Sequence, residues 1–277
     1  MRLLSLDGRF LIPRTNPAFG GFKSNDSVQV DGLWDVSNNF PMGNCAEHVA
    51  KQHGITREDQ DAHALESYRR AAAAWAAGKF DAEIAEVTIK HPKGDIVIRE
   101  DEEFKKVLPA KVPSLKPVFL KAEQGGTVTP ANASGIQDGA SAVVLMTGEA
   151  VAANGVEPLA KILGWADAAI DPIDFPIAPT VAIPLALKNA GVTADEVDLY
   201  ELNEAFSVVV RAAEKICGID PAKINVHGGA VALGHPIGSS GSRIVVTLVH
   251  ALKPGQIGVA AICNGGGAAT ALVVKRL

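Results

Sequence analysis

The chain has 277 residues, of which 47% are hydrophobic, and a formal net charge of -5 at pH 7. A chain of this length can bury one large hydrophobic core or two modest ones. Its negative charge provides no basic field for nucleic acid or for an anionic membrane, so we expect neither as a partner.

The cysteines and the apolar segments narrow the class further. Cys45, Cys217 and Cys263 are widely spaced and form no CxxC pair, which argues against a disulfide framework or a structural zinc site and fits a reducing compartment. The apolar stretches are too short and too often interrupted to span a bilayer, and the opening MRLLSLDGRFLIPR lacks the apolar region of a secretion signal. We therefore expect a soluble protein that is not secreted.

The first part of the chain predicts a long loop followed by two helices. Residues 1 to about 42 are rich in Asn, Asp, Gly and Pro, which is typical of loops. Helices are expected over residues 45–52 and 57–77, because each stretch ends at a glycine. Thr56 and Asp59 have the spacing of an N-terminal cap for the second helix.

A hairpin and a charged surface are expected next. Residues 87–89 and 96–98 alternate around a turn, which predicts a β-hairpin. The acidic run at residues 100–103 precedes several lysines and is typical of a solvated surface. These lysines are Lys105, Lys106 and Lys111.

From residue 159 onward, strands alternate with helices. The pattern predicts strands over residues 159–165, 197–202, 224–227, 259–263 and 268–274, and helices over residues 180–189, 204–216 and 239–252. The order βαβαβαββ indicates an α/β fold whose sheet needs cover on both faces. Residues 139–146 (GASAVVLM) resemble residues 267–274 (GAATALVV), which hints at an internal duplication.

Two glycine-rich turns carry the side chains with chemical potential. GHPIG at 234–238 contains His235, and CNGGG at 263–267 contains Cys263. A thiolate needs a nearby proton acceptor, and an oxyanion needs unobstructed N–H donors, so cysteine-based acyl or carbon-bond chemistry is expected. One alternative is that Cys263 is a buried structural cysteine. A separate alternative is that the glycines between residues 228 and 241 bind a dinucleotide, although the next strand offers no acidic residue for a ribose. His227 is interpreted as structural.

Four separated motifs resemble one known family. They are TVTPANASGIQDGA at 127–140, NEAF at 203–206, NVHGGAVALGHPIGSSGSR at 225–243 and CNGGG at 263–267. Together they resemble the thiolase family, and within it the short-chain acetyl-CoA C-acetyltransferases (acetoacetyl-CoA thiolases), over nearly the whole chain. The resemblance implies a thiolase-like αβαβα layered fold whose N-terminal half is incomplete here. By this resemblance, residues 1–120 form a loop domain-like region, 121–150 the remnant of the N-terminal half and 151–277 the C-terminal domain.

The resemblance also implies catalytic roles. Cys263 matches the base that removes a proton alpha to a thioester carbonyl, and His235 matches the residue that takes the nucleophile's proton and donates to the thioester oxygen. Asn203 matches the side chain that holds a water in one oxyanion hole, and the Gly265 N–H helps to form the other. A thiol suits the role of base if its pKa falls, which N–H groups of a glycine-rich turn favour.

Coenzyme A as substrate and product would explain several scattered residues. By resemblance, the coenzyme A contacts are Tyr68, Lys106, Lys111 and Ser134, and the walls of the pantetheine or acyl pocket are Met42, Phe119 and Phe206. For these three wall residues, ordinary core packing is an equal alternative. No cofactor is required for the chemistry, but close relatives bind potassium largely through backbone carbonyls. The matching residues are Tyr68, Pro130, Ala131, Ala133 and Val231.

The expected activity follows from the resemblance, with one departure. Such an acyltransferase interconverts two acetyl-CoA with acetoacetyl-CoA and CoA by a Claisen condensation, and the family's homo-oligomers include tetramers. The family's nucleophile lies in a C-x-S-G motif, which this sequence lacks, and neither Cys45 nor Cys217 matches it. The alternatives are therefore a truncated, inactive fragment, or a non-catalytic CoA-binding or assembly subunit. The compartment is expected to be cytoplasmic or mitochondrial.

Overall fold

A computed structural model describes residues 3–4, 10–11 and 25–277 of the chain. The expected loop over residues 1–42 therefore lies partly outside the described residues. Within it, short elements replace a featureless loop: β1 (Leu3–Leu4) pairs with β2 (Phe10–Leu11), a single π-helical turn covers Val28–Gly32, and β3 (Trp34–Asp35) pairs with β4 (Phe40–Pro41).

Two helices follow, as predicted. Helix α1 (Met42–His53) begins three residues earlier than the sequence indicated, and α2 (Arg57–Ala76) has the predicted bounds to within one residue. The α2 cap is reciprocal: the Asp59 N–H donates to Thr56 Oγ1 at 3.1 Å, and the Thr56 N–H donates to Asp59 Oδ2 at 3.0 Å. Local hydrogen bonds thus set where α2 begins.

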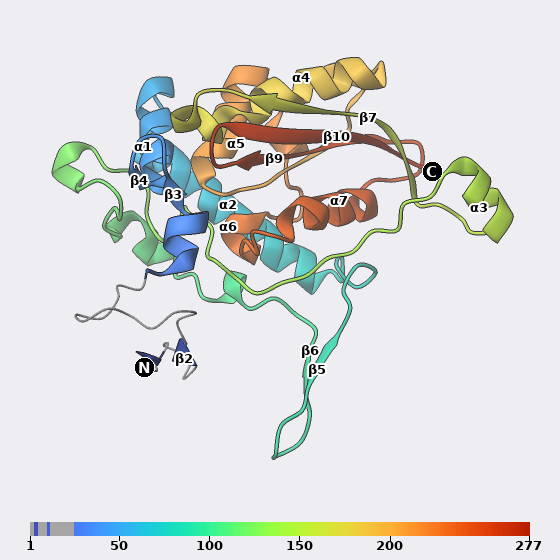
Figure 1. Ribbon diagram of the computed structural model, residues 1–277, viewed down its shortest axis with the longest axis horizontal. Helices are drawn as coiled ribbons and strands as arrows, with labels where there is room; N and C mark the ends of the chain where they lie inside the picture. Colours follow the sequence, from blue (N-terminus) through green and yellow to red (C-terminus); the bar gives the residue numbers. More distant parts are fainter. Residues whose placement is uncertain (1–2, 5–9, 12–24) are drawn as a thin grey trace.

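The predicted hairpin is also present. Strands β5 (Val87–Ile89) and β6 (Ile96–Ile98) pair antiparallel and project far from the rest of the molecule (Figure 1). All six strand residues are exposed. Three short 3-10 turns then lead back to the body of the protein, over Glu103–Lys105, Pro109–Ser114 and Ala122–Gln124.

A four-stranded sheet organises the C-terminal half. Its strands are β7 (Ala160–Ala169), β8 (Leu199–Leu202), β9 (Ile257–Asn264) and β10 (Ala268–Arg276), in the order β7-β10-β9-β8. Strands β8 and β9 run parallel, whereas β10 is antiparallel to both of its neighbours. The predicted α/β class is therefore confirmed for this half.

Helices cover both faces of this sheet, which forms the middle layer in Figure 1. Helices α4 (Pro179–Ala190) and α5 (Ser207–Cys217) pack on one face through small side chains such as Ala182 and Ala213. Helix α7 (Ser240–Ala251) packs on the other face through Ile244 and Leu248. Two shorter helices are α3 (Gly148–Asn154) and α6 (Ala230–Leu233). In the described part of the chain, no helix has the length and apolar character needed to cross a membrane.

One predicted strand, over residues 224–227, is wrong. Only Ile224 forms a parallel bridge, to Tyr200 of β8. At the next residue the backbone turns, with a φ of 45° at Asn225. The Asn225 side chain then accepts from the Leu202 N–H and donates to the Leu202 carbonyl, both at 2.8 Å. A side-chain amide thus takes the hydrogen bonds that a fifth strand would have made.

The suspected duplicate of β10 is not part of a sheet. Residues 139–146 form no regular element, whereas β10 is paired along both edges. The apolar end of residues 139–146 is open to solvent, with Val144 82% and Leu145 73% exposed. Exposed consecutive apolar residues of this kind are unusual for a strand-forming sequence.

Candidate active site

The candidate site lies where the parallel strands β8 and β9 end. Leu202 is paired with Ala261, and the N–H of the next residue, Asn203, donates to the Ala261 carbonyl at 3.0 Å. Cys263 lies two residues beyond Ala261 on β9. The carboxyl ends of these two strands therefore bring Asn203 and the Cys263 turn to the same edge of the sheet.

His235 reaches this edge from the loop between α6 and α7. Its N–H donates to the Gly135 carbonyl at 2.8 Å, which ties the histidine loop to the first half of the chain. The His235 Nε2 atom lies 3.4 Å from Asn203 Nδ2. Asn203 thus contacts His235 through its side chain and the β9 strand that precedes the Cys263 turn through its backbone. The pairing of His235 with Cys263 stays a prediction.

The turn after Cys263 demands glycine for steric reasons. Gly266 and Gly267 have φ values of 89° and 91°, in the left-handed region that favours glycine. A Cβ atom at Gly267 would lie 2.1 Å from the Ile170 carbonyl oxygen. A side chain at Gly267 would therefore prevent the turn from lying against Ile170, the residue after β7.

Of the predicted pocket walls, Met42 contacts this turn. A Cβ at Gly265 would lie 1.9 Å from Met42 Cε, so Met42 packs directly on the Gly265 backbone. The rings of Phe119 and Phe206 meet edge to face, with centroids 6.2 Å apart. All three side chains are partly buried. The two aromatic rings also contact a core cluster, which keeps both the wall and the core interpretation open.

Burial sets the charge states of the two central groups. It lowers the pKa of His235 to about 4, with a smaller contribution from the Arg243 cation, so the imidazole is neutral at physiological pH. Burial also raises the pKa of the Cys263 thiol to about 12, although part of that residue reaches solvent. The pKa decrease that the base role needs is therefore not provided by the turn alone.

The other two cysteines are poor nucleophiles. Cys45 is fully buried, and its thiol donates to Asp35 Oδ2 at 3.4 Å. Burial and this carboxylate raise the pKa of Cys45 to about 12. Burial also raises the pKa of Cys217. Both thiols remain protonated at neutral pH, in line with their mismatch to the C-x-S-G motif.

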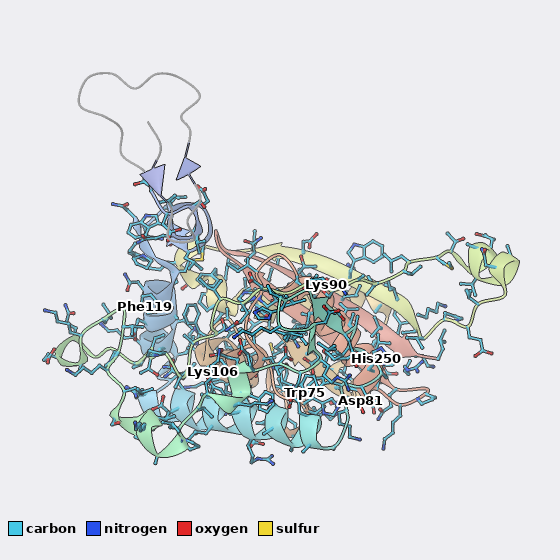
Figure 2. The ribbon with its side chains drawn as sticks, turned by 90° about the horizontal axis from the view of Figure 1, so that it is seen from below. Trp75, Asp81, Lys90, Lys106, Phe119 and His250 are labelled. Atoms are coloured by element: carbon cyan, nitrogen blue, oxygen red, sulfur yellow. The ribbon has the colours of Figure 1, made fainter. Side chains whose placement is uncertain are left out.

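The residues predicted to contact coenzyme A are scattered. Tyr68 is only 8% exposed, in a core cluster with Phe104. Lys106 lies 2.8 Å from Glu103, while Lys111 is exposed on its 3-10 turn. Ser134 donates through Oγ to the Ala205 carbonyl at 2.9 Å, beside the pocket-wall Phe206. In Figure 2, Phe119 lies beside α1, whereas Lys106 lies nearer the middle of the molecule.

The residues predicted to bind potassium fall into two groups that both contact α2. Val231 packs with Tyr68 in one buried cluster. The segment that contains Pro130, Ala131 and Ala133 is held by Asn132, whose side chain donates to Asp61 Oδ1 of α2 at 2.9 Å. In residues 25–277, no group of three or more His, Cys, Asp or Glu residues is placed to hold a metal ion.

Sequence reasoning missed a buried carboxylate beside the site. Glu204, in the NEAF motif, accepts hydrogen bonds from Ser67 Oγ at 2.8 Å and from Asn225 Nδ2 at 2.8 Å, and lies 3.2 Å from His63 Nε2. Burial by itself raises the pKa of Glu204, but His63 and these hydrogen bonds outweigh it and lower the pKa overall. The signal available in the sequence was an acidic residue, Glu204, between Asn203 and the apolar residues of the NEAF motif. Glu204 thus ties α2 to the loop that presents Asn203.

Comparisons with known proteins identify the family. The family model "Thiolase, N-terminal domain" matches residues 12–149, and "Thiolase, C-terminal domain" matches residues 156–276. The chain is 54% identical over 269 residues to mitochondrial acetyl-CoA acetyltransferase of Mus musculus, and 54% identical over 273 residues to mitochondrial acetyl-CoA acetyltransferase erg10A of Aspergillus fumigatus. Each alignment covers 97% of this chain but only 63% of the relative, so the chain spans less than two thirds of these relatives' length.

Solved structures give the same result for the fold. The Acat5 thiolase of Ascaris suum, crystallised in complex with coenzyme A, superposes with a TM-score of 0.90 at 49% identity, over 98% of this chain and 69% of that one. Human mitochondrial 3-ketoacyl-CoA thiolase gives a TM-score of 0.86 at 38% identity, over 95% of this chain and 67% of that one.

Proposed function

Because the chain belongs to the thiolase family, we propose that its site serves the interconversion of two acetyl-CoA with acetoacetyl-CoA and CoA. The observation that carries this proposal is the contact between His235 and Asn203, at the end of β8. The Asn203 N–H in turn donates to Ala261 of β9, two residues before Cys263. The similarity to acetyl-CoA acetyltransferases supports the choice of substrates.

The proposed chemistry has two stages. An enzyme thiol first takes an acetyl group from acetyl-CoA; its S–H proton goes to His235 Nε2 and then to the departing CoA thiolate. Next, the Cys263 thiolate removes a proton from the methyl group of a second acetyl-CoA. The resulting carbanion attacks the enzyme-bound acetyl carbon, the carbon–sulfur bond to the enzyme breaks, and acetoacetyl-CoA forms. Asn203, through a water, and the Gly265 N–H stabilise the two oxyanions.

The isolated chain is proposed to lack this turnover, because it contains no C-x-S-G nucleophile and its three thiols all have raised pKa values. An assay of acetoacetyl-CoA cleavage with purified chain tests this. Robust turnover would overturn the proposal and demand a different nucleophile, and Cys45→Ala and Cys217→Ala would then show whether either thiol supplies it.

A second candidate function is assembly with another polypeptide. The supporting observation is the unpaired apolar end of residues 139–146, whose C-terminal counterpart β10 is paired on both edges. An unpaired segment of this kind accepts further strands. Native mass measurement of the chain, alone and mixed with a full-length relative, tests this, because a mixture without any species that contains both polypeptides would contradict it.

Coenzyme A binding is proposed to involve Lys111, Lys106, Ser134 and Tyr68. Lysines suit nucleotide phosphates as mobile point charges. Lys111→Ala is expected to weaken coenzyme A binding about threefold to tenfold in calorimetry, as for loss of one charged contact. Lys90→Ala on the hairpin is the matched control, and equal effects of both variants would contradict the assignment.

Potassium, homo-oligomerisation and a mitochondrial location complete the proposal. Carbonyl groups of the 130–133 turn and Val231 are the candidate ligands for potassium, and a potassium-dependent rise in melting temperature, absent with sodium, tests them. The exposed apolar side chains of the projecting hairpin support a homo-oligomer. The names of the relatives support the mitochondrial location, which fractionation of cells that express the parent protein tests.

A further inference from the structure

Both ring nitrogens of His235 have a partner: Asn203, which belongs to the predicted site, and Ser240, which does not. Nδ1 lies 2.6 Å from Ser240 Oγ, and Nε2 lies 3.4 Å from Asn203 Nδ2. Ser240 is fully buried at the first position of α7. Its hydroxyl also lies 3.1 Å from the Pro236 carbonyl oxygen.

One direction of these contacts gives every hydrogen an acceptor. The Ser240 hydroxyl donates to the Pro236 carbonyl, which also accepts the backbone N–H groups of Ser239 and Ser240, and keeps its lone pairs for His235. The Nδ1–H group of His235 then donates to Ser240 Oγ. Because the neutral imidazole carries one proton, Nε2 has a free lone pair that accepts from the Asn203 amide.

We propose that Ser240 is a positioning residue that holds neutral His235 with its proton on Nδ1 and so leaves Nε2 as the proton acceptor. This inference rests on the proposed function in one respect, namely that Nε2 of His235 takes the S–H proton of the catalytic thiol. When that transfer occurs, the S–H bond breaks, an N–H bond forms at Nε2, and the imidazolium keeps its Nδ1–H bond to Ser240. The hydroxyl therefore remains a suitable acceptor in both charge states.

Nitrogen NMR of the chain, labelled with ¹⁵N at histidine and studied at neutral pH, tests the assignment. The signals of His235 are identified by their loss in His235→Asn. In the unaltered chain we expect a protonated-type shift at Nδ1 and an unprotonated-type shift at Nε2. Ser240→Ala leaves a buried N–H without an acceptor, so the ratio of the Nδ1–H to the Nε2–H form is expected to fall on the order of tenfold.

Two further variants separate this role from a structural one. Ser240→Thr keeps a hydroxyl at the position and is expected to restore the Nδ1–H form. Ser242→Ala is the matched control, because its Oγ donates to the Ser239 carbonyl at 3.0 Å on the same helix turn and has no contact with His235. It is expected to leave the His235 shifts unchanged. If Ser240→Ala does not fold, the Nδ1 shift of the unaltered chain and the threonine variant still decide the question.

The proposal is overturned if the unaltered chain carries the proton on Nε2, or if folded Ser240→Ala shows unchanged His235 shifts. Neither measurement uses a substrate. Robust turnover by the chain, found together with the proton on Nδ1, therefore contradicts the proposed lack of turnover and leaves the Ser240 assignment intact.

Discussion

At the scale of single residues, Cys263 combines a suitable place with an unsuitable charge state. It lies on β9 two residues after Ala261, whose carbonyl accepts from the Asn203 N–H. Burial nevertheless raises the pKa of its thiol to about 12. No cation contributes to lowering that pKa in the described residues. A bound thioester or further protein groups must therefore stabilise the thiolate before Cys263 acts as a base.

This charge state predicts slow alkylation. At pH 7, a thiol with a pKa near 12 is ionised in on the order of one molecule in 100,000, so Cys263 is expected to react with iodoacetamide far more slowly than free cysteine. The rate should rise about tenfold per pH unit between pH 7 and 9. Mass spectrometry of tryptic peptides measures this for each cysteine. Rapid labelling of Cys263 at pH 7 would show that its thiolate is stabilised after all.

The buried Glu204 predicts a large loss of stability on truncation. Glu204→Ala removes the acceptor for Ser67 and Asn225 and leaves His63 without its partner. We expect the free energy of unfolding to fall by about 3 to 5 kcal/mol, because the buried donors of Ser67, Asn225 and the Val231 N–H lose their acceptor. Urea denaturation measures this. Glu157→Ala, at an exposed position, is the control and is expected to change stability by less than about 0.5 kcal/mol.

At the scale of elements, the helix cap and the hairpin are local structures. Thr56 and Asp59 exchange two hydrogen bonds across three residues, which explains why the start of α2 could be predicted. Residues 87–89 and 96–98 pair across a short turn for the same reason. Residues 224–227 failed as a strand because the Asn225 side chain, 23 residues from its partner Leu202, captured the hydrogen bonds of β8.

The cap predicts a modest, local effect. Thr56→Ala removes the acceptor for the Asp59 N–H and is expected to lower the free energy of unfolding by about 1 kcal/mol. Thr56→Ser keeps the hydroxyl and should lose only a small part of that. Chemical denaturation followed by circular dichroism compares the two, and equal losses would mean that the methyl group rather than the cap matters.

The hairpin predicts association between copies of the chain. An isolated two-stranded hairpin is marginally stable in water, yet here Val87, Ile89, Ile96, Val97 and Ile98 are 45–59% exposed on it. Ile96→Lys together with Ile98→Lys is expected to shift a homo-oligomer toward smaller species, measured by light scattering after size-exclusion chromatography. Lys90→Glu at the turn is the control. An unchanged mass for the double variant would mean that the hairpin faces solvent.

At the scale of the whole molecule, a cluster of buried acidic groups joins the segment before the hairpin to α7 and the C-terminal sheet. Glu201 of β8 is buried 3.7 Å from Arg243 of α7. Burial raises the pKa of Glu201 to about 8, and burial likewise raises the pKa of Glu83 to about 7. Thr247 of α7 donates to Glu83 at 3.0 Å. The fold therefore keeps protons that the unfolded chain would release.

This cluster predicts that stability falls as the pH rises from 6.5 to 8. Over that range unfolded carboxyls are already ionised, so the folded state binds more protons and loses stability. Below pH 6.5 the lowered pKa of His235 acts in the opposite direction, which makes the upper window the informative one. Glu201→Gln is expected to flatten the decline by roughly 1 to 2 kcal/mol. Unfolding titrations at several pH values measure it, with Glu157→Gln as control; a parallel decline in both variants would contradict it.

The sequence by itself determined the local elements, the α/β class of the C-terminal half and, through ordered motifs, the family. Those features depend on periodicity, caps and turn residues that lie within a few positions of each other. Only the tertiary structure decided that Glu204 meets Ser67, 137 residues away, that His235 rests on Asn203 and Ser240, and that Cys263 stays protonated. Burial and long-range pairing set these properties, and neither can be read from neighbouring residues.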